Sequence, residues 1–253
     1  MLGILRDAGE KIWAVVADNY ESTLGINSRS QLAVAERILR RRKVEELMAD
    51  GVTIIDPHTT FIDAEVRVGM DTVIYPFTFL EGFTVIGEDC CIGPHVRFQN
   101  TVIGDGVKAH YVYAHDAEIE SGVDLGQFNH IRPDSHIGTG VKMGNFVEVK
   151  NSNIGTGAKL PHLSYIGDCD LGTNVNMGCG TITVNYDGKN KFRTVIEDNA
   201  FVGCNSNLVA PVTVGEGAYV AAGSTITRDV PAGTLSVARA RQKEIEGWHD
   251  KRK

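Results

Sequence analysis

Aliphatic residues recur at steps close to six along residues 86–230, and Gly often follows them. This step matches neither the 3.6-residue period of an amphipathic helix nor the alternation of hairpin strands. Hairpins would also need Asn-Gly or Asp-Gly at most connections, whereas here Gly follows the aliphatic residue. A step of six is typical of a parallel β-helix, in which each short strand places one aliphatic side chain in a narrow core. Clear repeat units begin at Ile137, Ile154, Ile166, Leu171, Val202 and Val214.

The pattern changes on both sides of this all-β solenoid. Residues 12–17 form an apolar run that predicts a short buried strand. Ser28 and Gln31 have the spacing of a capping box, which predicts a helix that continues to about Met48. Residues 239–253 predict a basic C-terminal tail helix. The sequence therefore predicts three parts, at residues 1–50, 51–232 and 233–253.

The composition bears on the cellular compartment of the protein and on the class of partner that it binds. The net charge of -7 argues against nucleic acid or an anionic membrane as the main partner. Residues 1–26 lack the order of a signal peptide, and no apolar run is long enough to cross a bilayer. We therefore expect a cytoplasmic protein. The five cysteines are scattered and odd in number, which is a poor basis for a disulfide framework.

A polar segment interrupts the repeat at residues 183–193. Insertions into a regular coil usually map to the binding face of a solenoid. Nearby, His162 lies inside the repeat unit that begins at Leu160, so we expect it on a rigid strand. A lone His is more often structural than catalytic, and spacing alone does not make His162 a base.

Several motifs in one order carry a resemblance to the acetyltransferase half of bacterial bifunctional GlmU. They lie at residues 130–133, 144–150, 162–168, 176–183, 185–191 and 208–212. The resemblance covers roughly residues 50–248, and residues 25–29 and 51–57 also match the family. It implies a left-handed β-helix that forms a homotrimer, with each active site between neighbouring subunits. It also implies that residues 1–50 are a remnant of the uridyltransferase domain with its linking helix, so we expect no uridyltransferase activity.

The function implied by this resemblance is acetyl transfer from acetyl-CoA to the amine of glucosamine-1-phosphate. The product, N-acetylglucosamine-1-phosphate, leads to UDP-N-acetylglucosamine, a precursor of peptidoglycan and lipopolysaccharide. His162 matches the catalytic base of the family, and no metal is expected for this step. The positions that match substrate-binding residues are Arg132, Lys150, Tyr165, Asn176, Asn185 and Lys191. The positions that match acetyl-CoA-binding residues are Tyr186, Cys204, Ala222 and Arg239.

One of these positions departs from the family. Cys204 stands where better-known relatives carry Ser. The exchange is harmless if the position contributes only its backbone N–H to the bound acetyl-CoA.

Two other functions remain open at this point. A trimeric β-helix zinc hydrolyase would use three His ligands with an open position for water. His110 and His115 offer two of them, and spacing does not decide the third among His95, His130 and His136. A noncatalytic hexapeptide scaffold is the other alternative, and it predicts that replacing His162 changes nothing measurable.

Overall fold

A computed structural model describes residues 1–249 of the chain. It divides into a first unit, Met1–Arg42, and a second unit that begins at Lys43. The first unit contains helix α1 (Leu2–Asp7), the 3-10 helix η1 (Tyr20–Thr23) and the start of helix α2 (Arg29–Ala49). The strand predicted at residues 12–17 is wrong, because this run forms no strand and its Val15 and Val16 are about nine-tenths exposed. Without a second strand beside it, the run has no partner for its backbone hydrogen bonds.

The predicted start of α2 is confirmed. The backbone N–H of Gln31 donates to Ser28 Oγ at 3.2 Å, as in a capping box. The Gln31 side chain, however, accepts from the N–H of Asn27 at 2.7 Å, one residue before the usual partner. In the second unit, Val44 and Leu47 of α2 are buried in the same apolar cluster as Val52 at the start of the solenoid. The last turns of α2 therefore contribute to the core of the first coil.

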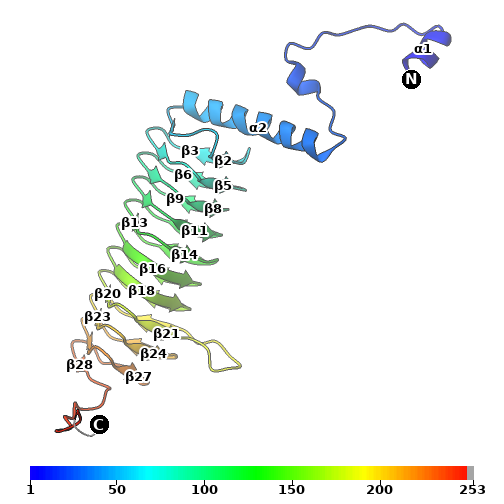
Figure 1. The fold of residues 1–253 in the computed structure, drawn as a ribbon. Helices are drawn as coiled ribbons and strands as arrows, with labels where there is room; N and C mark the ends of the chain where they lie inside the picture. The colour runs from blue at the N-terminus through cyan, green and yellow to red at the C-terminus, as the bar shows by residue number, and fades with distance from the viewer. Residues whose placement is uncertain (250–253) are drawn as a thin grey trace. The chain divides into compact units, whose positions relative to one another are not determined.

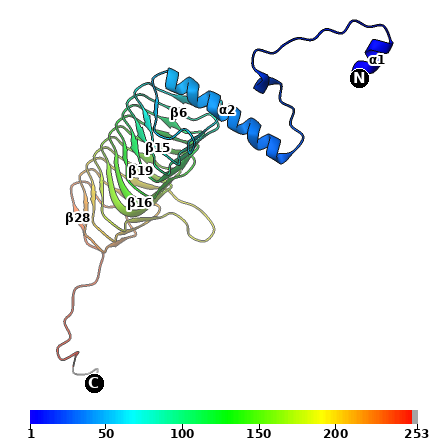
Figure 2. The ribbon, with the colours of Figure 1, turned by 45° about the horizontal axis from the view of Figure 1, so that its top comes forward.

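Most of the second unit is the expected parallel β-helix of hexapeptide repeats, which is confirmed (Figure 1). Its short strands stack in register into three faces, and the chain visits the first, second and third face in turn (Figure 2). The strands of the first face are β1 (Thr53–Ile54), β4 (Val73–Ile74), β7 (Cys91–Ile92), β10 (Lys108–Ala109), β13 (Asp124–Leu125), β20 (Asn176–Met177), β23 (Phe201–Val202), β26 (Tyr219–Val220) and β28 (Leu235–Ser236).

The second face carries the residues that matter most for the site. Its strands are β2 (Phe61–Ile62), β5 (Phe79–Glu81), β8 (Arg97–Gln99), β11 (Val112–His115), β14 (Asn129–Ile131), β21 (Ile182–Val184), β24 (Asn207–Val209) and β27 (Thr225–Ile226). Two longer strands, β16 (Lys142–Lys150) and β18 (Lys159–Gly167), pair along the first face and continue onto the second. They join these two faces into one sheet.

The third face is a separate parallel sheet. Its strands are β3 (Arg67–Val68), β6 (Val85–Ile86), β9 (Val102–Ile103), β12 (Ala117–Ile119), β15 (Ser135–Ile137), β17 (Asn153–Ile154), β19 (Cys169–Leu171), β22 (Thr194–Ile196) and β25 (Val212–Val214).

The core is a column of aliphatic side chains inside each face. On the third face Ile137, Ile154 and Leu171 stand in direct register, one per coil, and all are buried. The Gly that follows each of them has a steric cause. A Cβ added at Gly155 would lie 2.5 Å from the carbonyl carbon of Gly172 in the next coil. Coils can therefore stack at strand spacing only if this corner has no side chain.

The C-terminal tail differs from its prediction. Residues 237–249 form no helix and are exposed, so the predicted tail helix is wrong over this stretch, and its end at 250–253 lies outside the described residues. An isolated helix of this length is marginal in water, and Gly247 weakens it further. In the described part of the chain, no helix is long and apolar enough to cross a membrane.

Candidate active site

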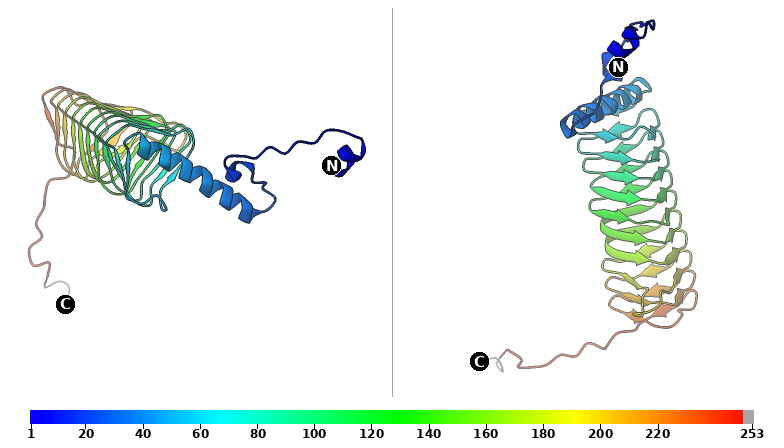
Figure 3. Two further views of the ribbon diagram at one scale, coloured as in Figure 1. Left: turned by 90° about the horizontal axis from the view of Figure 1, so that it is seen from above. Right: turned by 90° about the vertical axis from the view of Figure 1, so that its right-hand side faces the viewer.

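Most of the predicted site residues lie on the two edges of the second face, whereas Asn176 is in β20 of the first face and Tyr165 is in the second-face part of β18. The first edge is the corner between the first and second faces, where residues 144–146 and 161–163 turn. The second edge is the corner between the second and third faces, formed by residues 150–151, 167–168 and the loop 185–193. Both edges run the length of the solenoid (Figure 3).

His162 is exposed on the first edge, within β18 and in register with Asn145 of β16. It lines a groove of about 450 Å³ together with Asn176, which comes from the next coil. Asp124, Lys142 and Lys159 line the same groove, one residue from each of three successive coils. The imidazole therefore lies in an open groove that is accessible to a small substrate, and the separate roles predicted for His162 and Asn176 stay predictions.

Three of the predicted acetyl-CoA positions follow His162 down the same edge: Cys204, Ala222 and Arg239. The register of successive coils places first Cys179, then Cys204 and then Ala222 below His162. Arg239 comes after them, and its guanidinium donates to the carbonyl oxygen of Ala222 at 2.8 Å. From His162 to Arg239 this column spans about four coil spacings, or roughly 19 Å at strand separation.

The Cys204 position offers a backbone donor on this edge. Its side chain is exposed, and among residues 1–249 its N–H has no hydrogen-bond acceptor. The N–H is thus available to a bound ligand.

The second edge gathers positive charge. Lys150 and Lys191 lie side by side, and the hydrogen bond and charge of Lys150 lower the pKa of Lys191 below its ordinary value. Tyr165 is also close to Lys191, and its hydroxyl lies over Gly167, where a Cβ would be only 2.4 Å away. Two ammonium groups held together in this way are a suitable site for a phosphate group.

Arg132 lies on the second edge one coil before Lys150, where its N–H bonds the carbonyl of Val149. Its guanidinium donates to Glu148 at 2.9 Å, and both side chains are more than a third exposed. An exposed pair of this kind contributes little to stability, so Arg132 remains free to exchange partners when an anion binds.

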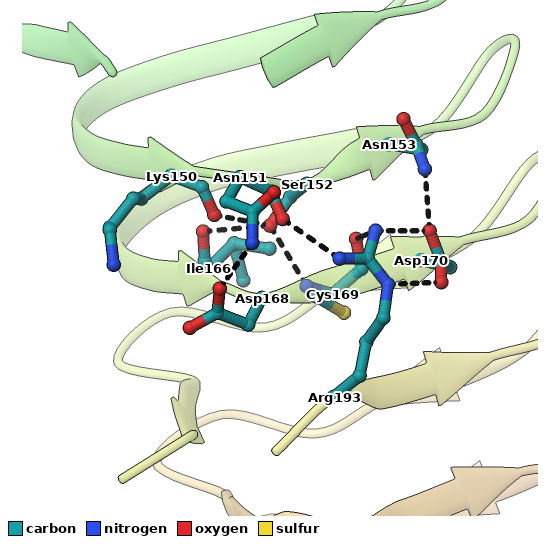
Figure 4. A network of polar contacts seen from close by, with 9 residues as sticks. All are labelled: Lys150, Asn151, Ser152, Asn153, Ile166, Asp168, Cys169, Asp170 and Arg193. Carbon is teal, nitrogen blue, oxygen red and sulfur yellow. Dashed lines mark hydrogen bonds and ion pairs between the residues drawn. The ribbon is translucent and has the colours of Figure 1, made fainter. Parts of the chain in front are cut away.

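Backbone and side-chain hydrogen bonds hold the base of the inserted loop. Tyr186 and Lys191 form an antiparallel bridge, and the N–H of Phe192 donates to the carbonyl of Asn185 at 2.9 Å. Arg193 then clamps the loop to the coils behind it (Figure 4). Its guanidinium binds both carboxylate oxygens of Asp170 and also donates to the carbonyls of Asn151 at 3.1 Å and Cys169 at 3.3 Å.

One chain does not bring all predicted residues together. His162 and the paired lysines lie on opposite edges, since the five residue steps from His162 to Gly167 cross the whole second face, up to about 17 Å in extended form. Tyr186 lies in the loop of the second edge, away from Cys204 and Ala222 on the first. A site that contained all of the predicted residues would therefore need the first edge of one chain to meet the second edge of another.

The histidines of the zinc alternative do not converge. His110 directs Nδ1 to the carbonyl oxygen of Gly93 at 2.5 Å, and His115 and His130 stack face to face at 5.8 Å. Burial lowers the pKa of His130, and the neighbouring charges of His115 and Arg132 add to this effect. Within residues 1–249 no three His, Cys, Asp or Glu side chains are placed to hold a metal ion.

Comparison with known proteins agrees with the fold. Residues 193–228 match the family model described as "Bacterial transferase hexapeptide (six repeats)". The β-helix and this match define a hexapeptide-repeat protein. A solved structure that resembles it is the UDP-N-acetylglucosamine acyltransferase of Francisella novicida, with a TM-score of 0.42 and 18% identity over 74% of this chain and 67% of that chain.

The sequence relatives are more specific. The chain is 58% identical over 251 residues to the bifunctional protein GlmU of Geobacillus sp. (strain WCH70). The matched region covers 99% of this chain and 55% of that protein. It is 55% identical over 251 residues to the GlmU of Geobacillus thermodenitrificans (strain NG80-2), with the same coverage. The chain is therefore homologous to GlmU over almost its whole length, and it spans about half the length of these curated relatives.

Sequence reasoning missed three residues that the structure places at these edges. Cys179 stands between His162 and Cys204, and the six-residue register could have shown it. Asp168 binds the side chain of Asn185, and Arg193 holds the loop. No periodic signal marks Arg193, because its contacts reach across coils far apart in the sequence.

Proposed function

We propose that this chain transfers the acetyl group of acetyl-CoA to the amine of glucosamine-1-phosphate. The observation that carries the proposal is the order of residues along the first edge. An imidazole stands at one end, a free backbone N–H follows, and a guanidinium ends the column roughly 19 Å away. This order suits a long thioester with its reactive carbonyl at His162 and its phosphates near Arg239. We place the reaction in the cytoplasm, as the sequence leads us to expect.

The chemistry needs a proton acceptor and a donor for developing charge. The substrate amine attacks the thioester carbonyl, so a C–N bond forms and the C–S bond breaks. His162 takes the proton from the amine and passes it to the departing CoA sulfur, a role usually worth roughly 10² to 10⁴ in rate. A preorganised backbone N–H, such as that of Cys204, would stabilise the oxyanion.

The second edge would hold the sugar phosphate. Lys150 and Lys191 supply point charges for the phosphate, and Arg132 adds a fork of donors. Asn185 lies beside them, while Asn176 lies in the groove of His162. Residues from both edges must therefore contact one small substrate.

This division supports a homotrimer with sites between subunits. If the first edge of one subunit lies against the second edge of its neighbour, His162 meets the paired lysines. A largely exposed ladder of aromatic rings along the first edge favours such a contact: Phe77, His95, Tyr111, Phe128 and Phe146. Neighbouring centroids are 4.8–5.5 Å apart, and all pairs are stacked except the tilted pair Tyr111–Phe128. Contiguous exposed apolar surface of this kind usually marks a protein interface.

Release of free CoA thiol tests the proposal. We expect thiol release that requires both acetyl-CoA and glucosamine-1-phosphate, and a loss of about 10² or more in kcat for His162→Ala. His136→Ala is the matched control, since His136 pairs with Glu120 on the third face, away from both edges. No thiol release from a folded oligomer would restore the scaffold alternative.

Mixing variants tests the shared site. His162→Ala and Lys191→Ala homotrimers are each expected to be inactive. After subunit exchange, mixed trimers contain some interfaces with both native edges, so partial activity should return. If verified exchange restores nothing, the two residues do not come from different subunits.

A further inference from the structure

Asp168 is a buried carboxylate at the centre of the second edge. It follows β18 directly, is 6% exposed and has a backbone φ of +49°. Ionised carboxylates are almost never this buried unless they are paired. Neither the proposed reaction nor the motifs of the sequence assign it a role, so its surroundings need an explanation.

Two side-chain amides bind its two oxygens. Asn151 Nδ2 donates to Asp168 Oδ1 at 2.5 Å, and Asn185 Nδ2 donates to Asp168 Oδ2. An ionised carboxylate only accepts hydrogen bonds, so Asn185 must turn its NH₂ toward Asp168. Its Oδ1 is then left as an acceptor for another donor. Asp168 thus decides which end of Asn185 a substrate meets.

Charges surround the same carboxylate. Lys150, Lys191 and Arg193 all interact electrostatically with Asp168, and Tyr165 interacts with Lys191. Burial acts to raise the pKa of Asp168, but the two amides and the two lysines outweigh it and hold the pKa below its ordinary value. One negative charge thus stands beside two ammonium groups, which leaves about one positive charge unbalanced.

The nearby acidic residue Asp170, in β19, has a different role. Asp170 is occupied by the guanidinium of Arg193 and by Asn153, whose Nδ2 donates to it at 2.6 Å (Figure 4). Among residues 1–249 no guanidinium donates to the carboxylate of Asp168, and its side-chain partners are Asn151 and Asn185. Asp170 therefore serves the fold of the loop, whereas Asp168 points at the residues proposed to bind substrate.

We propose that Asp168 is a positioning residue that orients Asn185 and holds Lys150 and Lys191 together as a preformed site for the phosphate of the sugar substrate. This inference rests on the proposed function. It makes a counterintuitive prediction, because the residue that builds the anion site is itself an anion.

Asp168→Asn tests the proposal with little change in shape. Asn tolerates the left-handed backbone conformation as well as Asp does. The matched control is Asp134→Asn, two coils earlier on the same edge and with a φ of +59°. If Asp168 only contributed a negative charge, its removal would strengthen phosphate binding, because it would reduce the repulsion of the anion. If Asp168 is a positioning residue, its removal should instead weaken phosphate binding.

The expected result is a rise of roughly 10- to 100-fold in KM for glucosamine-1-phosphate, as for the loss of a charged hydrogen bond. KM for acetyl-CoA should stay within about twofold, because neither amide that binds Asp168 is an acetyl-CoA position. Binding of inorganic phosphate, measured by calorimetry on the full chain, should weaken in parallel. Without Asp168 the pKa of Lys191 falls further, so the alkaline loss of sugar phosphate binding should move to lower pH. Asp134→Asn should match the wild-type protein in all four measurements.

The outcomes separate the two proposals. If the wild-type protein transfers acetyl groups but Asp168→Asn binds phosphate equally or more tightly, the positioning role is overturned and the function stands. If the wild-type protein neither turns over nor binds phosphate, both are overturned. If Asp168→Asn does not fold, Asn151→Gly removes one amide partner at a position whose φ of +44° suits Gly, and it should raise KM for the sugar phosphate in the same direction. An unchanged KM in that variant would overturn the positioning role.

Discussion

The clamp at the base of the inserted loop permits a quantitative prediction. Replacing Arg193 with Met keeps a long apolar stem and removes the guanidinium. The variant loses both bonds to Asp170 and the contacts to the carbonyls of Asn151 and Cys169. Asp170 then keeps Asn153 as its remaining side-chain partner among the described residues.

The magnitude follows from burial. A desolvated charged hydrogen bond contributes about 1.5–3 kcal/mol, whereas an exposed ion pair contributes about 0–1 kcal/mol. The side chains of Arg193 and Asp170 are 37% and 39% exposed, so solvent screens much of their attraction. With the two carbonyl contacts included, we expect a loss of about 2 kcal/mol in the free energy of unfolding. For a chain of this size that lowers Tm by about 4–8 °C.

Thermal unfolding at two pH values tests the cause. The hydrogen bond from Arg193 lowers the pKa of Asp170, so the pair stabilises the fold above the unfolded-state pKa and loses this contribution as pH falls through the folded-state pKa. The Tm difference between wild type and Arg193→Met should be full at pH 7 and should shrink below about pH 4. Lys189→Met removes the same charge from the exposed tip of the same loop and should leave Tm unchanged. A difference that persists undiminished at pH 3, or equal effects of both variants, would refute this reasoning.

Three further substitutions test the coil and the first edge. Gly155→Ala places a Cβ 2.5 Å from the next coil and should cost about 1–3 kcal/mol, seen as a lower Tm, whereas Gly25→Ala, with its nearest contact at 3.7 Å, should change nothing. Phe98→Ala removes a fully buried ring and should cost about 3–5 kcal/mol in urea unfolding; a cost under 1 kcal/mol would mean that the core refills the space. Cys204→Ser should leave KM for acetyl-CoA within about twofold, because the exposed side chain is not needed, and a large rise would assign the thiol a role of its own.

The repeat was the most predictable part of the protein. Each coil contacts mainly its neighbours, so a local step of six is enough to indicate the global architecture. The same locality explains the start of α2, where Ser28 caps the helix from one turn away. The two wrong elements, at residues 12–17 and 239–249, are segments with apolar or helical composition but no packing partner in the described structure. Composition alone does not reveal whether such a partner exists.

The sequence by itself determined the solenoid and the candidate chemistry, because periodicity and short motifs are local properties. Only the tertiary structure decided how that chemistry is arranged. It placed His162 and Lys150 on opposite edges of one face, because the strands of the second face lie between these two corners in every coil. It brought Lys191 beside Lys150 and buried Asp168 among their neighbours, since an inserted loop folds back over coils that are distant in the sequence. Contacts of this kind depend on the stacking of coils and on the path of one loop, which no repeat in the sequence encodes.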